Sequence, residues 1–283
     1  MKILITGAGG HLGLALVHRL SGRHAVTVAR REDLDVCDPG AVRDAVAGVS
    51  PDVILNCAAY TDVDGAEDEP VEALEVNALA VASLSRAACR VGAALVHYST
   101  DFVFDGLTDR PYGESDPPNP RSTYACSKLV GEWFARDVAR HYVLRVESLF
   151  GAPAGPGRRT SVDRIVDAIL AGDEAAVFVD RTVSPSYTAD VSYATEALIE
   201  GRPPGLYHCV NSGQCTFLEL ASEAARLAGR EARLRPVLME GLGLRAERPK
   251  YCALSNARLG SVGIEMPAWT DALARYLRQR LSA

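Results

Sequence analysis

The stretch Thr6-Gly7-Ala8-Gly9-Gly10-His11-Leu12-Gly13, residues 6–13, decides the fold of this 283-residue chain. It follows an apolar run at residues 2–6 and precedes residues 12–20, where apolar side chains recur at helical spacing. A strand, a tight turn and a helix are therefore predicted. Glycine lets the backbone of such a turn approach a pyrophosphate, whose charge the N–H groups and dipole of the helix stabilise. We expect dinucleotide contacts at Gly7, Gly10, His11, Leu12 and Gly13.

The same alternation continues along the chain. Strands are predicted at 25–29, 53–56, 94–98 and 141–146, and helices at 41–49, 71–91 and 123–140. Strands that alternate with helices indicate a parallel sheet covered on both faces, which is the doubly wound α/β (Rossmann) fold.

The pattern is less regular in the second half. Strands are predicted near 176–179 and 206–210, and helices near 188–200, 216–228 and 268–281. We assign residues 1–150, with about 183–212, to a dinucleotide-binding domain. Residues 151–182 and 213–283 are assigned to a smaller, interleaved substrate-binding domain, with the glycine- and proline-rich segment 151–159 as the crossing point.

Charge and composition exclude several classes of partner. A formal net charge of −6 at pH 7 argues against a nucleic-acid or anionic-membrane surface, since both require a basic face. Glycines interrupt the N-terminal apolar run before it resembles a signal peptide, and no apolar run is long enough to span a bilayer. The seven cysteines are scattered without a C-x-x-C pair. We expect reduced thiols, a cytoplasmic location and no metal site.

The residues after strand 25–29 bear on the choice of cofactor. An acidic side chain at this position favours NAD, whereas a 2′-phosphate needs positive charge. Here the strand is followed by Arg30 and Arg31, and the acidic Glu32 and Asp33 come one step later. NADPH is therefore predicted, and NADH stays open. The alternative is that both arginines are simply solvated, with Glu32 paired to one of them.

Tyr124 and Lys128 are the candidate proton-transfer residues. They lie four residues apart in the predicted helix 123–140 and therefore share one face, and the chain has only two other lysines. A nearby ammonium is expected to stabilise the phenolate and to lower the pKa of Tyr124. Thr100 follows strand 94–98 at the sheet edge where doubly wound folds bind ligands, so we expect it to hydrogen-bond a substrate carbonyl. Alternatively, it merely caps the strand end.

Several runs of sequence resemble the dTDP-4-dehydrorhamnose reductase group of extended short-chain dehydrogenases. These are TGAGGHLG (6–13), NCAAYTDVDGAE (56–67), EVNALA (75–80), HYSTDFVFDG (97–106), NPRSTYACSK (119–128) and RPKYCALSNARL (248–259). The resemblance covers nearly the whole chain and implies NAD(P)H-dependent reduction of the C4 ketone of a nucleotide-linked 6-deoxy-sugar. It implies a catalytic set of Thr100, Tyr124 and Lys128. It also implies cofactor-side positions at Asp35, Val36, Ala58, Ala59, Tyr60 and Asn77.

The substrate side departs from the pattern of this group. Phe102 stands where a second tyrosine is expected, Ser148 lies in the run where the group tends to place a tryptophan, and Arg181 replaces a common glutamine. With Asp101, these three positions are the predicted substrate contacts. Glu147 and Arg181 are either new charges in the pocket, members of an internal ion pair, or solvent-facing.

Two other functions stay open. One is reduction of a different ketone from secondary metabolism. The other is a non-catalytic NADP-binding role, because the regulatory subunit of methionine adenosyltransferase resembles the same group. An intact Thr100, Tyr124 and Lys128 argues against the second. The expected partner is a nucleotide-sugar or another small ketone, and a homodimer also stays open.

Overall fold

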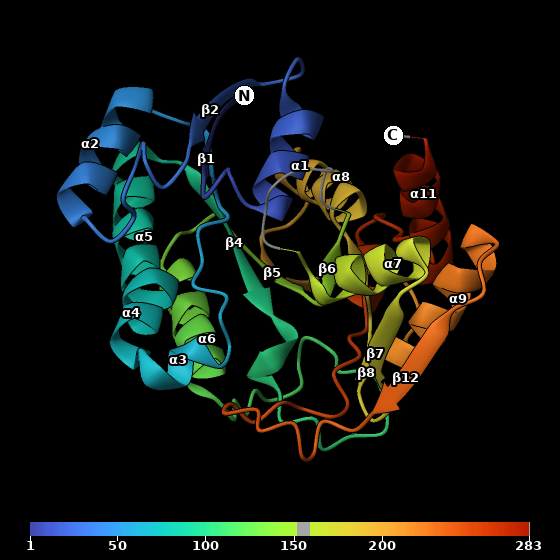
Figure 1. Cartoon of the computed structure of the whole chain (residues 1–283). Helices are drawn as coiled ribbons and strands as arrows, with labels where there is room; N and C mark the ends of the chain where they lie inside the picture. The colour runs from blue at the N-terminus through green and yellow to red at the C-terminus, as the bar shows by residue number, and fades with distance from the viewer. Residues whose placement is uncertain (152–158, 283) are drawn as a thin grey trace.

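Six parallel strands form the central sheet, in the order β2-β1-β3-β4-β5-β10. The computed structural model describes residues 1–151 and 159–282. The strands are β1 (Lys2–Thr6), β2 (Ala25–Ala29), β3 (Val53–Asn56), β4 (Ala94–Thr100), β5 (His141–Val146) and β10 (Gly205–His208). The chain adds β2 on one side of β1 and returns to β3 on the other, so the strand order reverses between β1 and β3 (Figure 1). This topology confirms the predicted doubly wound fold.

Helices cover both faces of the sheet because alternate strand residues point to opposite sides. Ile3 and Ile5 of β1 pack with α1 (His11–Leu20) and α8 (Thr188–Ile199) in one buried cluster. Leu4, between them, packs in a second cluster with α2 (Pro39–Val49) and α5 (Ala80–Val91). Helix α6 (Thr123–Ala135) lies beside α5 on that second face and ends earlier than predicted (Figure 1).

The predicted helix 71–91 is continuous but widens in its middle. It consists of α4 (Pro70–Leu74), a π-helical turn η1 (Glu75–Leu79) and α5, and the short α3 (Gly65–Asp68) precedes it. The turn lies against α6 at Gly131, where an added Cβ atom would come within 2.2 Å of the Asn77 carbonyl oxygen. Single π-helical turns occur frequently at functional sites.

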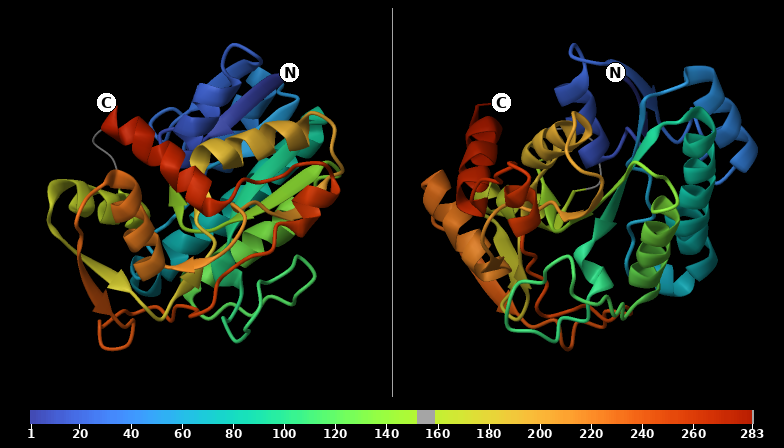
Figure 2. Two further views of the ribbon diagram at one scale, coloured as in Figure 1. Left: turned by 90° about the vertical axis from the view of Figure 1, so that its right-hand side faces the viewer. Right: turned by 180° about the vertical axis from the view of Figure 1, so that it is seen from behind.

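A separate hydrophobic cluster lies beside the sheet. It contains α7 (Ser161–Ala171), α9 (Phe217–Ala228), α11 (Trp269–Leu281) and the strand β7 (Glu174–Phe178), which pairs with β12 (Arg233–Val237). Figures 1 and 2 show these elements together at one side of the molecule. The structure also contains α7, β12 and α10 (Ala257–Ser261), which were not predicted from the sequence. Most of the predicted crossing segment 151–159 lies outside the described residues.

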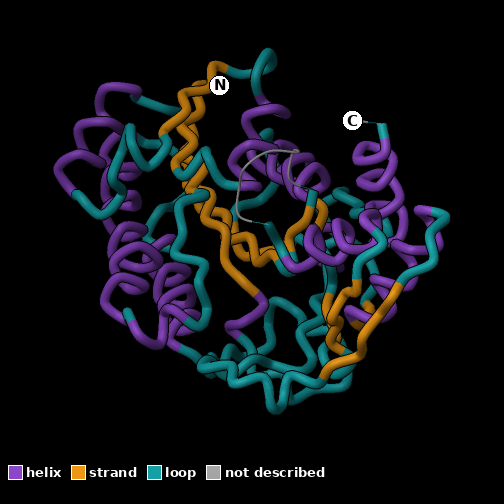
Figure 3. Tube along the Cα trace, in the orientation of Figure 1, coloured by secondary structure: helices purple, strands orange, loops and turns teal. Residues whose placement is uncertain are grey.

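Short strands and loops complete the structure at the carboxyl edge of the sheet. β6 (Leu149–Phe150) pairs with β9 (Ser186–Tyr187), and β8 (Thr182–Val183) pairs with β11 (Cys215–Thr216). A 3₁₀ turn η2 (Asp101–Val103) follows β4. Loops near residues 104–122 and 238–256 gather at this end (Figure 3), joined through the backbone hydrogen bond from Ser255 N to Tyr112 O.

The contact at Gly131 yields a stability prediction. Gly131→Ala should destabilise the fold by about 1–3 kcal/mol, because its methyl group would overlap the Asn77 carbonyl and force α6 away from η1. Gly48→Ala in α2 is the matched control, since an added Cβ there meets open space, and it should stabilise by about 0.5–1 kcal/mol. Urea denaturation measures both. Equal effects would contradict the close approach.

Candidate active site

The glycine turn between β1 and α1 is shaped by two close backbone contacts. Gly7 has a left-handed φ of +64°, and a Cβ atom there would lie 2.4 Å from the Ala58 nitrogen. A Cβ atom on Gly13 would lie 2.7 Å from the Ala8 Cα atom. Gly10 begins α1, and within the described ranges no side chain caps this helix start. The N–H groups of the first turn are therefore placed to bind an anion.

Arg30 and Arg31 lie at the end of β2, beside this turn, where Ala8 N donates to Ala29 O at 3.3 Å. Their side chains are 58% and 91% exposed, with only long ion-pair distances of 3.8 Å to Glu32 and 4.0 Å to Glu72. Such exposed pairs are weak and leave both guanidinium groups available to a phosphate.

The predicted adenine-side residues follow in the next turn. Asp35 accepts from Cys37 N at 2.9 Å, and Val36 is buried. A hollow of about 590 Å³ lies between this turn and α4, lined among others by Arg31, Asp35 and Val76. The structure thus brings the glycine turn, the two arginines and residues 35–36 to one end of the sheet.

Asn77 connects the loop after β3 to helix α6. Its Oδ1 accepts from Tyr60 N, and its Nδ2 donates to Tyr60 O and to Ser127 Oγ, all at 3.0 Å. Ser127 Oγ in turn donates to Tyr124 O at 2.8 Å. Residues 58–60 are therefore held against the start of α6. Ser127 was not singled out in the sequence, although it lies between Tyr124 and Lys128.

Lys128 is buried, with 3% of its surface exposed, and its ammonium donates to Tyr98 O at 2.6 Å. Burial lowers the pKa of Lys128 to about 8, an effect that the carboxylate of Glu132 partly offsets. The side chain therefore retains its proton at neutral pH and points to the carboxyl end of β4.

The Thr100 hydroxyl lies between Tyr124 and Asp101. It donates to Asp101 Oδ1 at 2.9 Å and lies close enough to the Tyr124 phenol to lower the pKa of Tyr124. It also accepts from Phe102 N at 3.2 Å, so it caps η2 as well as facing the phenol. The Phe102 ring meets the Tyr124 ring edge-on at 5.7 Å between centroids.

The expectation of a lowered pKa for Tyr124 is wrong for this structure. Burial raises the pKa of Tyr124, the negative charge of Asp101 raises it further, and the bond to Thr100 offsets only part of the rise. The Lys128 ammonium, which was expected to lower this pKa, hydrogen-bonds the Tyr98 carbonyl instead. Tyr124 is therefore a neutral proton donor at pH 7.

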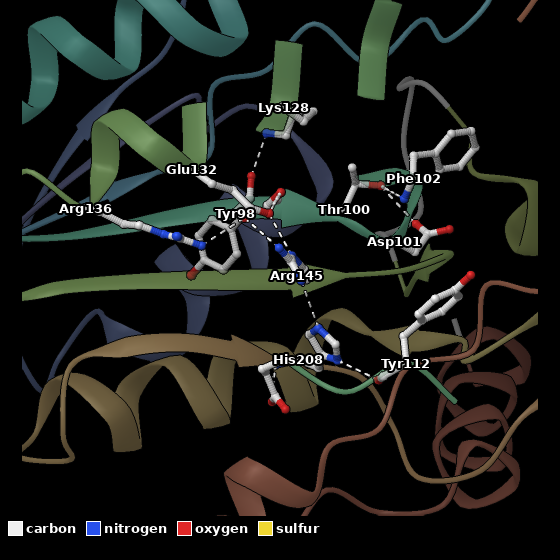
Figure 4. A network of polar contacts seen from close by, with 12 residues as sticks. Tyr98, Thr100, Asp101, Phe102, Tyr112, Lys128, Glu132, Arg136, Arg145 and His208 are labelled. Atoms are coloured by element: carbon white, nitrogen blue, oxygen red, sulfur yellow. Dashed lines mark hydrogen bonds and ion pairs between the residues drawn. The ribbon is translucent and has the colours of Figure 1, made fainter. Parts of the chain in front are cut away.

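A buried ion pair fixes α6 on the sheet (Figure 4). The Glu132 carboxylate accepts from Nε and Nη2 of Arg145, each at 2.8 Å, and from Ser99 Oγ at 2.6 Å. Arg145 also reaches His208 Nε2 at 3.4 Å, and burial together with Arg145 lowers the pKa of His208 to about 3. This ion pair was not predicted from the sequence. The sequence feature that points to Glu132 is its spacing from Tyr124 and Lys128, which places all three side chains on one helical face.

Three of the four predicted substrate-side residues lie together. Arg181 Nη2 is 3.2 Å from Asp101 Oδ2, and its guanidinium carbon lies 4.8 Å from the centroid of the Phe102 ring. Glu147 joins Asp101 in one buried group, so the alternative of an internal charge cluster applies to Glu147 and Arg181. Ser148 lies apart from this group in the hydrogen-bond pattern: its φ is +42°, and its carbonyl accepts from Ser186 N at 3.4 Å.

Two of the runs that carry the resemblance meet across the carboxyl edge. The Asp64 carboxylate, in the loop after β3, accepts from Arg248 Nη2 at 2.7 Å and from the Ala246 backbone N–H at 3.1 Å. These bonds lower the pKa of Asp64 to about 2. The contact ties the loop after β3 to segment 245–248.

The sheet topology and the glycine turn place this chain among the dinucleotide-binding α/β proteins. Residues 1–282 match the family described as RmlD substrate binding domain, and the chain belongs to that family. A dTDP-4-dehydrorhamnose reductase of Streptomyces griseus is 40% identical over 282 residues, or 95% of this chain and 91% of that protein. A probable dTDP-4,6-dihydroxy-2-methyloxan-3-one 4-ketoreductase of Streptomyces antibioticus is 36% identical over 100% of this chain and 97% of its own length.

Solved structures agree with this assignment. The dTDP-4-dehydrorhamnose reductase of Bacillus anthracis str. Ames, in complex with NADP, matches with a TM-score of 0.92 at 32% identity. The match covers 98% of this chain and 99% of that one. The predicted family resemblance is confirmed. In the part of the chain that the structure describes, no helix has the length and apolar character needed to cross a membrane.

The burial of Lys128 predicts a pH-dependent cost to stability. Its pKa of about 8 lies below the value of about 10.4 expected in the unfolded chain, so the buried charge destabilises the fold at pH 7. This cost disappears as the pH rises from about 8 to above 10, where the unfolded state binds more protons than the folded one. Lys128→Met should therefore raise the free energy of unfolding at pH 7 by roughly 1–3 kcal/mol.

Denaturation at pH 7 and pH 10 measures this difference, which should shrink at the higher pH. Lys250→Met, at an exposed lysine, is the matched control and should change stability by less than about 0.5 kcal/mol. A loss of stability at pH 7 in Lys128→Met would overturn the expected sign.

Proposed function

We propose that this protein is an NADPH-dependent reductase of the 4-keto group of a nucleotide-linked 6-deoxy-sugar. The observation that carries the proposal is the position of Thr100 beside the Tyr124 phenol, whose pKa it lowers, with buried Lys128 one helical turn further along α6. All three side chains lie where β4 and the start of α6 meet, at the edge where doubly wound sheets bind their ligands. Relatives named as dTDP-4-dehydrorhamnose reductases support the substrate class.

The described residues fit an NADP-type cofactor. The glycine turn has close backbone contacts that exclude side chains, the start of α1 is free for a pyrophosphate, and Arg30 and Arg31 offer charge for a 2′-phosphate. When bound, the cofactor would supply the hydride. Lys128 would hold the ribose of the nicotinamide end. Residues 35–36 and 58–60 would border the rest of the dinucleotide.

The protein's own residues would manage the proton. Tyr124 is a neutral donor because its pKa is raised by burial and by Asp101, so it can protonate the substrate oxygen. Thr100 would orient the carbonyl beside the phenol. The Phe102 ring lies nearly perpendicular to the Tyr124 ring and limits where that ring can point.

We further infer that residues 151–182 and 213–283 form the substrate-binding part. Its support is the separate hydrophobic cluster built on α7, α9 and α11. Whether the protein is a homodimer and whether it is cytoplasmic remain predictions from the sequence.

A second candidate keeps the chemistry and changes the ketone. Phe102, Glu147, Ser148 and Arg181 depart from the pattern of the rhamnose-type reductases, and a relative at 36% identity is named as a 4-ketoreductase of a different dTDP-sugar. An intact Thr100, Tyr124 and Lys128 argues against a non-catalytic regulatory role.

The first test follows NADPH oxidation with dTDP-, UDP- and GDP-linked 4-keto-6-deoxy-sugars. Turnover is expected with one nucleotide series, and Tyr124→Phe should lower kcat roughly 10²- to 10⁴-fold while the Kd for NADPH is unchanged. Tyr193→Phe is the matched control, since this exposed tyrosine of α8 should leave kcat unaltered. Turnover of Tyr124→Phe at the wild-type rate would refute the assignment.

The second test addresses the cofactor. The double variant Arg30→Ala with Arg31→Ala should weaken NADPH binding roughly 10- to 100-fold and leave NADH binding unchanged, because only NADPH carries the 2′-phosphate. Arg43→Ala, an exposed arginine of α2 paired with Asp44, serves as the control. Calorimetry with both cofactors gives the ratio. An equal loss for NADPH and NADH would rule out phosphate recognition by this pair.

A further inference from the structure

Four ionisable side chains from separate segments meet behind the proposed catalytic residues. Asp101 follows β4, Glu147 follows β5 and Arg181 precedes β8. Cys252 comes from the loop between β12 and α10. Their exposed fractions are 3%, 1%, 8% and 0%. The ligand-type atoms of Asp101, Glu147 and Cys252 all lie within 4.8 Å of one another. Only Asp101 of this buried acid cluster has a role in the mechanism described above, through its charge beside Tyr124; Glu147, Arg181 and Cys252 have none.

The charges of the cluster do not balance if both carboxyl groups are ionised. Arg181 is its one cation among the described residues, and it pairs with Asp101 at 3.2 Å. A second buried carboxylate would be uncompensated, at a cost of several kcal/mol. Burial and the nearby Asp101 raise the pKa of Glu147 well above its usual value, and burial raises the pKa values of the neighbouring Cys252, Cys215 and Tyr251. The cluster therefore retains one carboxyl proton at neutral pH.

Only one of the two carboxylate oxygens of Glu147 has a hydrogen-bond partner among the described residues. Its Oε2 accepts from Ser184 N at 2.6 Å, whereas its buried Oε1 has no hydrogen-bond partner in the part of the chain described. A carboxyl oxygen left without a partner in a buried site is costly, and such groups often mark a functional role. Since one carboxylate oxygen of Glu147 lies within 4.8 Å of one of Asp101, a side-chain rotation or one bridging water would connect the two carboxyl groups.

A path leads from the cluster to the phenol. Asp101 Oδ1 is 2.9 Å from the Thr100 hydroxyl, and that hydroxyl lies beside the Tyr124 phenol, whose pKa it lowers. A hydroxyl can accept a proton on one side while it donates one on the other. Figure 4 shows Thr100, Asp101 and Phe102 together at the end of β4, apart from the Glu132–Arg145 network.

We propose that Glu147 and Asp101 store one shared proton and return it through the Thr100 hydroxyl to Tyr124 after each reduction. The inference rests on the proposed function, in which Tyr124 loses a proton to the substrate oxygen. The Thr100 hydroxyl gives its proton to the Tyr124 phenolate and takes one from Asp101, which is replenished by Glu147. One O–H bond forms for each one broken, and a proton from solvent later restores the pair.

The direction of this transfer follows from the acidities. A carboxylic acid, even with a raised pKa, is a stronger acid than a buried phenol, so the proton moves from the carboxyl pair to the phenolate. The negative charge that this leaves in the cluster lies beside Arg181. Glu147 is a positioning residue, since it touches neither substrate nor cofactor and acts only through Asp101 and Thr100.

Glu147→Gln tests the proposal because the amide keeps the shape and can still accept from Ser184 N. Steady-state kcat should fall roughly 10-fold and lose the pH dependence contributed by the pair. The first turnover, in which Tyr124 is already protonated, should keep its wild-type rate in rapid-mixing experiments. Glu196→Gln is the matched control: Glu196 is 3% exposed and paired with Arg19, away from Tyr124, and its replacement should change neither rate.

An unchanged steady-state rate and pH profile in Glu147→Gln would overturn the proposal. An equal loss in the first turnover would also overturn it, since it would indicate a role in holding the site's shape. Carbon NMR of protein labelled at the Asp and Glu carboxyl groups tests proton storage without substrate. One neutral carboxyl resonance at pH 7, lost in Glu147→Gln, is expected; its absence overturns the inference. If it is present but no ketone is reduced, the proposed function fails instead.

Discussion

The Glu132 carboxylate and the Arg145 guanidinium, both about 1% exposed or less, are joined by two parallel hydrogen bonds within the core. Removing one partner of such a pair leaves an uncompensated buried charge, which costs about 3–5 kcal/mol. The pair joins α6 to β5, while Ser99 binds the same carboxylate from β4. The rotation of α6 about its axis is thereby fixed, and with it the direction in which Tyr124 and Lys128 point.

A second constraint acts on the other side of α6. Gly131 allows η1 to approach so closely that the Asn77 amide can bond both to Tyr60 and to Ser127. The Asn77 side chain therefore sets both the position of α6 and that of the loop after β3, which borders the proposed cofactor. The two constraints together hold the phenol, the ammonium and the loop after β3 in one arrangement.

The sequence predicted the features that arise from local pattern. The strands at 25–29, 53–56 and 141–146 have the predicted bounds, because each is a short run rich in apolar and β-branched residues. The widened turn at Asn77 was not predictable, since it results from contact with Gly131, which lies far along the chain. For the same reason the pKa of Tyr124 was predicted in the wrong direction. Asp101 and burial decide it, and neither can be read from the spacing of Tyr124 and Lys128.

The exposure of Arg30 and Arg31 has a consequence for how this protein could diversify. Their side chains extend into solvent and take no part in the core, unlike Lys128, whose burial weakens the fold. Under the proposed contact with the 2′-phosphate, cofactor preference is separable from stability: substitutions at these two positions would change the preferred dinucleotide without weakening the core. The residues proposed to transfer the proton have no such freedom, since Thr100, Asp101 and Lys128 are also buried in the protein.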